Sequence, residues 1–197
     1  MEVRTITLGI YQTNTYLIVK NNQVIIIDPV SKADRIQNII QDNEKVVGIC
    51  LTHGHFDHIG AVDDLVQIYK CPVYIHELDF EMTQDPEKNY SQTKKIKLKS
   101  KQKFYQDSMS IGDFTFDVYH TPGHTKGSVC LKFDQILFSG DTLFKGSIGR
   151  TDLYGARPQE MKQSLRFLRT LQDNLIIYPG HDGSTTLFDE LKRNPYL

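Results

Sequence analysis

Short apolar runs separated by polar turns divide this chain into predicted strands. Alternation over residues 3–8 predicts one strand, and the apolar stretches within 14–28 predict further strands up to Asp28. More strands are predicted over 46–51, 72–76, 111–119, 128–133, 136–139 and 175–178. The runs at 24–27 and 46–51 contain no polar alternation, so we expect these two strands to be buried.

Apolar residues at helical spacing predict helices between these strands. One helix is expected to open at Ser31, with Asp34 at the capping-box position and an apolar stripe of Ile36, Ile39 and Ile40. A helical turn is predicted over 77–82, a helix near Pro158 and a closing helix over 186–193. Another helix follows residue 58, with one face formed by Leu65, Ile68 and Tyr69. Strands and helices intermix throughout, which favours an α/β or α+β fold in one domain over residues 1–197.

The composition is that of an ordinary globular protein. Of the 197 residues, 39% are hydrophobic and 24% charged, too apolar a balance for disorder. The net charge of −1 argues against a nucleic-acid partner held by bulk charge. No apolar run reaches the ~18 residues that span a bilayer, and the N-terminus lacks a secretory signal, so we expect a cytoplasmic protein without a membrane partner. The three cysteines are expected to be buried thiols: Cys50, Cys71 and Cys130.

The segment from Lys88 to Lys103 holds seven lysines and no acidic residue. Lysines alternate with other residues over 95–103, which predicts an exposed edge strand or ribbon, where lysine also blocks pairing between sheet edges. A solvated face is the ordinary interpretation of such a run. Attraction of an anionic substrate or of a nucleic-acid backbone is the alternative, and the sequence leaves both open.

Three of the seven histidines crowd into six residues together with Asp57, directly after the strand predicted at 46–51. Residues two apart in an extended segment point the same way, so His53 and His55 can grip one ion. Asp57 and His58 enter the next helix, face elsewhere and can hold a second ion. We therefore expect this cluster to bind metal.

Further ligand-type side chains follow three other predicted strands, namely His124, Asp141 and His181. Five imidazoles and two carboxylates exceed what one tetrahedral ion needs, which predicts two divalent metal ions about 3.5–4 Å apart with Asp141 as the bridge. Nitrogen and oxygen ligands favour zinc, with iron or manganese as alternatives. The remaining histidines, His76 and His120, are interpreted as structural side chains.

These motifs together resemble the metallo-β-lactamase fold superfamily, and the likeness covers nearly the whole chain. Beyond the seven residues above, it includes the segments 14–17, 28–29, 121–125, 140–144, 146–152, 179–181 and 194–197. The resemblance implies a four-layer αββα sandwich with the metal site at one edge of the two sheets.

Within that superfamily the chain is most similar to short bacterial relatives of glyoxalase II, the hydroxyacylglutathione hydrolases. The resemblance implies hydrolysis of a small acyl-thioester by a hydroxide that bridges two metal ions. Asp57 would also act catalytically by orienting the hydroxide, and Arg150 and Lys145 would attract a carboxylate of the substrate. By the same resemblance, the first metal is held by His53, His55 and His124, the second by Asp57, His58 and His181, and Asp141 bridges them.

Departures from glyoxalase II leave other activities open. The chain ends before the helical extension of the full-length enzymes, and Gly183 stands where they have a tyrosine, so the thiol need not be glutathione. Persulfide dioxygenases, which use one iron, share the run 149–152 but usually have cysteine where Ile148 stands. True β-lactamases of this fold usually have cysteine where Asp141 stands. A mononuclear-iron dioxygenase is the first alternative, and a metal-dependent nuclease or nucleic-acid-binding protein is the second. The oligomeric state is left open.

Overall fold

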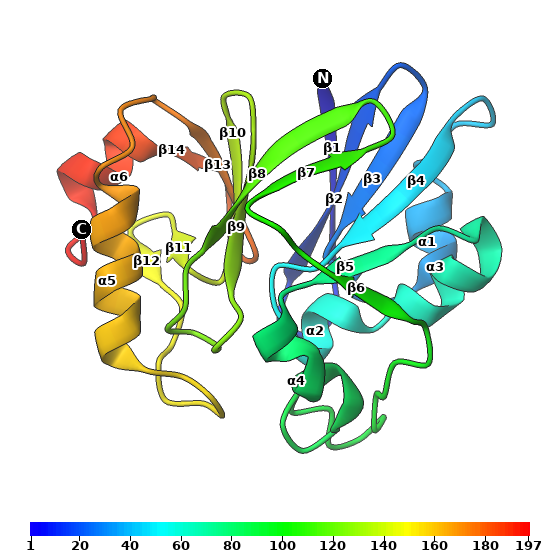
Figure 1. The fold of residues 1–197 in the computed structure, drawn as a ribbon, viewed down its shortest axis with the longest axis horizontal. Helices are drawn as coiled ribbons and strands as arrows, with labels where there is room; N and C mark the ends of the chain where they lie inside the picture. The colour runs from blue at the N-terminus through cyan, green and yellow to red at the C-terminus, as the bar shows by residue number, and fades with distance from the viewer.

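The computed structural model describes all residues, 1–197, and has four layers (Figure 1). Two six-stranded sheets lie face to face, and helices cover the outer face of each sheet. This arrangement confirms the predicted αββα sandwich. In spatial order, the first sheet consists of β1 (Glu2–Leu8), β2 (Thr13–Lys20), β3 (Gln23–Ile27), β4 (Lys45–Cys50), β5 (Val73–Ile75) and β6 (Gln102–Phe104).

The second sheet is built entirely from the later part of the chain. Its spatial order is β14 (Thr185–Thr186), β13 (Ile176–Pro179), β10 (Ile136–Gly140), β9 (Val129–Phe133), β8 (Phe114–His120) and β7 (Ser108–Ile111). A small separate hairpin joins β11 (Leu143–Phe144) to β12 (Ser147–Ile148). Each half of the molecule therefore contributes one complete sheet to the sandwich.

The helices fall into two sets, one for each half. The first half carries α1 (Ala33–Gln37), α2 (Phe56–Ile59), α3 (Val62–Tyr69), the 3-10 turn η1 (Glu77–Asp79) and α4 (Phe80–Gln84). The second half carries α5 (Pro158–Leu168) and α6 (Leu187–Arg193). The longest of them, α5, has 11 residues, and no helix is both long and apolar enough to cross a bilayer.

Three apolar cores separate the four layers. The two faces of β2 show how: Leu17 packs into the core beneath α1 and α3, while Tyr16 and Ile18 pack into the core between the sheets. A third core lies between the second sheet and its helices and includes Leu165. Strands buried on both faces need apolar side chains at every position, which explains the continuous runs in β3 and β4. All three cysteines are buried free thiols, as predicted.

Strand direction brings the predicted ligand-bearing loops to one edge. β10 runs parallel to β13, and β9 is antiparallel to both β8 and β10, so β8, β10 and β13 share a direction. In the first sheet β4 runs parallel to β3 and β5. The loops after β4, β8, β10 and β13 carry the predicted ligands.

One local prediction is wrong and another is confirmed only in part. The first α-helix is capped by Lys32 in a left-handed conformation (φ 55°), without the side-chain hydrogen bond expected of Ser31, and Ile39 and Ile40 pack on the core beyond its end. The lysine-rich segment forms no strand or ribbon over 95–101, but residues 102 and 103 lie in β6, the edge strand of the first sheet, so the predicted edge strand is confirmed only there. Side chains satisfy its backbone instead: Asp63 accepts the N–H groups of Lys99 and Ser100.

Candidate metal centre

Four loops deliver the seven predicted ligands to one place. The loop after β4 carries His53 and His55, and α2 begins immediately afterwards and carries Asp57 and His58. The other three ligands come from the second half of the chain, one from each of the loops after β8, β10 and β13: His124, Asp141 and His181. Both halves of the sandwich are therefore needed to assemble the cluster.

The structure brings all seven side chains together. Three sets each place their nitrogen or oxygen donor atoms within 4.8 Å of one another: His53–His55–His124, His53–His58–Asp141 and Asp57–His58–His181. We call the first of these the histidine group and the last the mixed group. They match the two sets that the resemblance implied.

Asp141 lies between the two groups. Its Oδ2 atom is 3.3 Å from Nε2 of His124 and 3.4 Å from Nε2 of His181, and its Oδ1 atom is 3.4 Å from Nε2 of His58. One carboxylate thus approaches imidazoles of both groups, as a bridging ligand would.

A buried acid beside the cluster orients two of the imidazoles. Asp28 accepts the Nδ1–H of His58 over 2.9 Å and the hydroxyl of Thr52 over 2.6 Å, and the Thr52 oxygen lies 3.1 Å from Nδ1 of His53. Hydrogen bonding at Nδ1 leaves the Nε2 lone pair of each ring aimed into the cluster, which is the usual arrangement behind a metal-ligating histidine.

Backbone carbonyl groups perform the same task for two further rings. His124 Nδ1 donates to the carbonyl of Arg150 over 2.8 Å, and His181 Nδ1 donates to the carbonyl of Tyr11 over 3.0 Å. His55 is turned the other way: its Nδ1 atom faces the cluster, 2.9 Å from Nε2 of His124. Two imidazole nitrogens at this distance need a proton or a cation between their lone pairs.

Unpaired buried polar atoms indicate that the cluster fits a bound cation. Four buried side-chain atoms of the protein have no hydrogen-bond partner, and all four belong to this cluster: His53 Nε2, His55 Nε2, His58 Nε2 and Asp141 Oδ1. Buried polar atoms are almost always paired, because leaving one unpaired costs about 1–3 kcal/mol. Two imidazole nitrogens and a carboxylate oxygen within reach of each other would regain that energy by coordinating a divalent cation.

The charge environment differs between the two ends of the cluster. Burial, followed by the neighbouring imidazoles, holds the pKa of both His53 and His55 well below the ordinary value. Burial opposes charge at His58 too, but the carboxylates of Asp141, Asp57 and Asp28 outweigh it and raise its pKa to about 10. The carboxylates thus make the region around His58 favourable for a positive charge.

Asp57 is the most accessible carboxylate of the cluster. Its side chain is 15% exposed, whereas that of Asp141 is 9% exposed. Asp57 Oδ2 accepts the Thr13 hydroxyl over 2.9 Å and lies 3.5 Å from Nε2 of His181. The other Asp57 oxygen remains available to a molecule that approaches from solvent.

The two predicted substrate-binding residues lie in different surroundings. Arg150 follows the β11–β12 hairpin, and its guanidinium forms two 2.8 Å bonds to Asp152, from Nε and Nη2, which leaves the Nη1 edge free. Lys145, on the hairpin, is exposed and lines a hollow of about 640 Å³ together with Arg193 and Thr186. No predicted ligand lines that hollow, so the structure does not bring Lys145 into the cluster.

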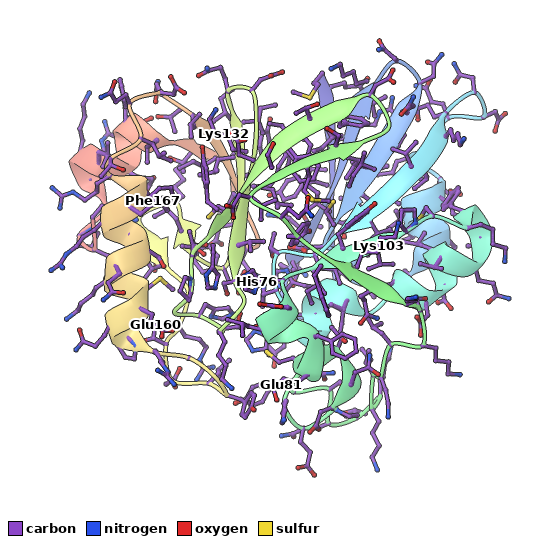
Figure 2. The ribbon with its side chains drawn as sticks, viewed as in Figure 1. His76, Glu81, Lys103, Lys132, Glu160 and Phe167 are labelled. Atoms are coloured by element: carbon purple, nitrogen blue, oxygen red, sulfur yellow. The ribbon has the colours of Figure 1, made fainter.

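His76 and His120 lie apart from the other five histidines. Their rings stack on each other with centroids 4.1 Å apart. His76, which is labelled in Figure 2, caps η1 by accepting the Leu78 N–H. His120 hydrogen bonds to the carbonyl of Lys126. Burial and the neighbouring imidazole lower the pKa of His76 to about 4. These contacts agree with a structural role for the pair.

Two buried acids that support the site were not predicted from the sequence. The sequence indicates Asp28 only as the end of a predicted strand and as part of the family likeness at 28–29, and it assigns no role to Asp79. Both are almost inaccessible to solvent, at 2% and 0%. The available signal was an acid directly after an apolar strand at 24–27, and an acid four residues after the strand at 73–75.

Comparison with known proteins gives the same family from sequence and from structure. The family model for the metallo-beta-lactamase superfamily matches residues 8–181. A probable metallo-hydrolase of Bacillus subtilis, YqgX, is 33% identical over 206 residues, covering 100% of this chain and 98% of that protein. A hydroxyacylglutathione hydrolase of Tolumonas auensis is 34% identical over 85% of this chain but only 60% of its own length.

Solved structures agree over almost the full length. BLEG-1, described as a B3 metallo-beta-lactamase, superimposes with a TM-score of 0.93 at 36% identity and covers 100% of this chain and 99% of its own. TTHA1623, solved in a di-iron-bound form, gives a TM-score of 0.89 at 35% identity, with coverage of 98% and 100%. The chain belongs to the metallo-β-lactamase superfamily.

Proposed function

We propose that this protein is a hydrolase that holds two divalent metal ions and cleaves small acyl-thioesters. One ion would be held by the histidine group (His53, His55 and His124), the other by the mixed group (Asp57, His58 and His181), with Asp141 shared. The observation that carries the proposal is the convergence of seven donor side chains, three of which point a buried atom without any hydrogen-bond partner into the cluster: His53 Nε2, His58 Nε2 and Asp141 Oδ1.

Divalent ions bound there would lower the pKa of water and polarise a carbonyl oxygen, the two effects that hydrolysis of an ester needs. Nitrogen-rich ligands favour zinc. The di-iron form of TTHA1623, a relative at 35% identity, supports iron as the alternative.

Asp57 is proposed as the group that moves the proton. During hydrolysis, water adds to the acyl carbon, the carbon–sulfur bond breaks and the sulfur leaves as a thiolate. Asp57 is partly exposed and is fixed by the Thr13 hydroxyl, so its free oxygen can orient the attacking water, accept its proton and pass the proton to the departing sulfur.

Arg150 is proposed to bind a carboxylate of the substrate. Its guanidinium has five N–H donors, and Asp152 occupies only two of them. Its backbone carbonyl holds His124, so the residue lies next to the histidine group. Lys145 receives no support from the structure for this role, because it lines a separate hollow.

The thioester is favoured by the likeness to the hydroxyacylglutathione hydrolase of Tolumonas auensis, because the bond between an acyl group and the sulfur of glutathione is a thioester. That protein is considerably longer than this chain. The acyl group and the thiol of this protein therefore have to be identified by assay.

β-Lactam hydrolysis is the second candidate, and a specific observation favours it. BLEG-1 matches this chain over its full length at 36% identity, more closely than the Tolumonas auensis hydrolase does. A lactam carbonyl needs the same two effects as a thioester carbonyl, and an Arg150 side chain would suit the carboxylate of such a substrate.

The deciding experiment measures the metal content and the activity of the purified protein. A panel of acyl-thioesters is assayed beside a panel of β-lactams, with oxygen uptake recorded on glutathione persulfide. We expect two metal ions per chain and thioester turnover that a chelator abolishes. Oxygen uptake with one iron per chain, or turnover of lactams alone, would overturn the thioesterase proposal.

Asp57→Asn tests the proton-moving role. The amide keeps the shape of the side chain and an oxygen that can contact a metal ion, but it cannot accept a proton. In variant protein that retains both metal ions by elemental analysis, we therefore expect kcat to fall by about 10²–10⁴-fold with KM changed little. The matched control is Asp113→Asn, which alters an exposed acid on the β7–β8 turn, outside the cluster and away from Arg150. An Asp57→Asn variant with unchanged kcat would contradict the assignment.

A further inference from the structure

Asp79 is a fully buried acid that the proposed reaction does not use. It ends η1 and directly precedes α4, and its relative exposure is 0%. It is not one of the seven donor side chains of the cluster. A buried carboxylate is costly unless several donors satisfy it, so its partners indicate what it does.

The carboxylate of Asp79 joins two loops that are far apart in the sequence. Its Oδ2 atom accepts the backbone N–H of Gly54 over 3.0 Å and the hydroxyl of Thr125 over 2.7 Å. Its Oδ1 atom accepts the backbone N–H of Gly127 over 2.6 Å. All three donors are neutral backbone N–H or hydroxyl groups. The carboxylate therefore clamps the two loops together by hydrogen bonds and not by an ion pair.

The two clamped loops carry all three ligands of the histidine group. Gly54 is the residue between His53 and His55, and Thr125 directly follows His124. Asp79 makes no hydrogen bond to the segments that bear Asp57, His58 and His181. Its contacts therefore concern one half of the metal centre only.

Both glycines are necessary for this close approach. A Cβ atom on Gly54 would lie 2.8 Å from Cβ of Met82, and a Cβ atom on Gly127 would lie 2.8 Å from Oδ1 of Asp79. Both contacts are shorter than side chains tolerate, so the glycines let the two loops reach the carboxylate.

Asp28 and Asp79 hold different parts of the metal centre in place. Asp28 directly holds His58 of the mixed group and reaches His53 through Thr52. Asp79 fixes the backbone on either side of the histidine group. Outer partners of this kind typically change metal affinity by about 10–100-fold when they are removed.

We infer that Asp79 is a positioning residue for the histidine group: it sets the spacing between the loop of His53 and His55 and the loop of His124, and thereby the affinity of that group alone for its metal ion. The inference rests on the proposed two-ion centre but is independent of the substrate.

Asp79→Asn breaks the clamp with almost no change in volume. An amide offers one acceptor oxygen and one donor NH2 group. If the oxygen takes the Oδ2 position, the NH2 group faces the Gly127 N–H; if the amide is flipped, it faces the Gly54 N–H. In either orientation one backbone hydrogen bond is lost.

The experiment measures metal affinity without any substrate. Zinc binding to the apo-protein is followed by competition with a chromophoric chelator in two backgrounds. The His181→Ala background disables the mixed group, and the His124→Ala background disables the histidine group. We expect Asp79→Asn to weaken binding at least tenfold in the first background and less than twofold in the second.

Asp63→Asn is the matched control. The Asp63 carboxylate also accepts two backbone N–H groups and one hydroxyl, from Lys99 and Ser100, but it clamps a loop that bears no ligand. We expect its substitution to leave zinc affinity unchanged in both backgrounds.

Thr125→Val serves if Asp79→Asn does not fold, because it deletes only one of the three donors to the carboxylate. We expect the same selectivity with a smaller shift. Equal weakening in both backgrounds, unchanged affinity in both, or an equal effect of Asp63→Asn would overturn the inference.

The outcomes separate this inference from the proposed activity. A wild-type protein that binds two zinc ions but hydrolyses no thioester would refute the proposed substrate and leave the Asp79 assignment standing. A wild-type protein that binds fewer than two zinc ions would overturn the two-ion centre and this inference together.

Discussion

The histidine group and the mixed group lie side by side but present different surfaces. The three imidazoles of the histidine group are 1%, 4% and 2% exposed. In the mixed group His58 is fully buried, but the side chains of Asp57 and His181 are 15% and 20% exposed. Buried neutral ligands hold an ion in a rigid setting, while accessible ligands allow exchange with solvent and substrate. The comparison indicates an inner site that anchors its ion and an outer site that meets the substrate.

The largest expected effect comes from removing the residue that the two sites share. Asp141→Ala should weaken both ions and lower kcat/KM by more than about a hundredfold, because its oxygens approach imidazoles of both groups at 3.3–3.4 Å. Elemental analysis and steady-state kinetics measure the two losses. The control Asp113→Ala changes an acid on the β7–β8 turn and should alter neither. Full metal content in Asp141→Ala would refute a shared ligand.

Truncating one ligand in each group should separate the inner site from the outer one. His124→Ala leaves a hole at a fully buried position and frees the Arg150 carbonyl, so we expect the apo-protein to lose about 1–3 kcal/mol of its free energy of unfolding. His181→Ala, at the exposed rim, should cost less than about 1 kcal/mol. Each variant should retain one metal ion. Urea denaturation of the two apo-proteins measures their free energies of unfolding. Equal losses in the two variants would contradict the distinction between an inner and an outer site.

Arg150→Ala and Lys145→Ala test whether substrate recognition belongs to the metal cluster or to the separate hollow that Lys145 lines. Arg150 lies beside the histidine group and keeps free N–H donors, so its loss should raise KM for carboxylate-bearing thioesters about tenfold with kcat nearly unchanged. Lys145→Ala should leave KM unaltered, because its hollow contains no donor of the cluster. Neutral thioesters provide the control substrates. A rise in KM for Lys145→Ala alone would reverse the assignment.

The smallest effect concerns the histidine pair outside both groups. Because burial and the stacked His120 lower the pKa of His76 to about 4, the unfolded chain binds the proton more readily than the folded protein. The contribution of this pair to the free energy of unfolding should be complete above pH ~6.5, which is the pKa of a histidine in an unfolded chain. That contribution should be lost as the pH falls toward 4. His76→Phe should flatten that part of the curve of unfolding free energy against pH. An unchanged slope would show that the pair does not contribute to the pH dependence of the free energy of unfolding.

Much of the site was predictable because its residues share a local pattern. The predicted ligands follow strands, directly or at the start of α2, and strand direction brings these ends to one edge, so spacing and family likeness were enough to name seven side chains that the structure places together. Spacing accounts for His53 and His55 lying in one set, because residues two apart in the loop after β4 point the same way; the rest of the grouping came from the family likeness.

What the sequence could not provide was the support of those donors. Asp28 and Asp79 act through hydrogen bonds to residues 24 or more positions away, and no local spacing encodes such contacts. The alternating lysines were a poor guide for the same reason: Asp63, 36 positions before Lys99, accepts the backbone N–H groups there, so the alternation gives a strand only at residues 102–103. The predicted Ser31 cap failed because Lys32 adopts a left-handed turn there.

The division of ligands between the two sheets has a consequence for how the protein matures. Each group draws donors from both halves of the chain, so neither half can load its ion before the two have associated. Bound ions would then hold the two halves of the chain together. A ligand that binds only the native state adds about 4 kcal/mol to the free energy of unfolding when its concentration is a thousand times its Kd. When metal is scarce, we expect the contact between the two halves of the chain to open before the rest of the fold. Proteolysis of newly made protein would then reveal the shortage before an assay of turnover did.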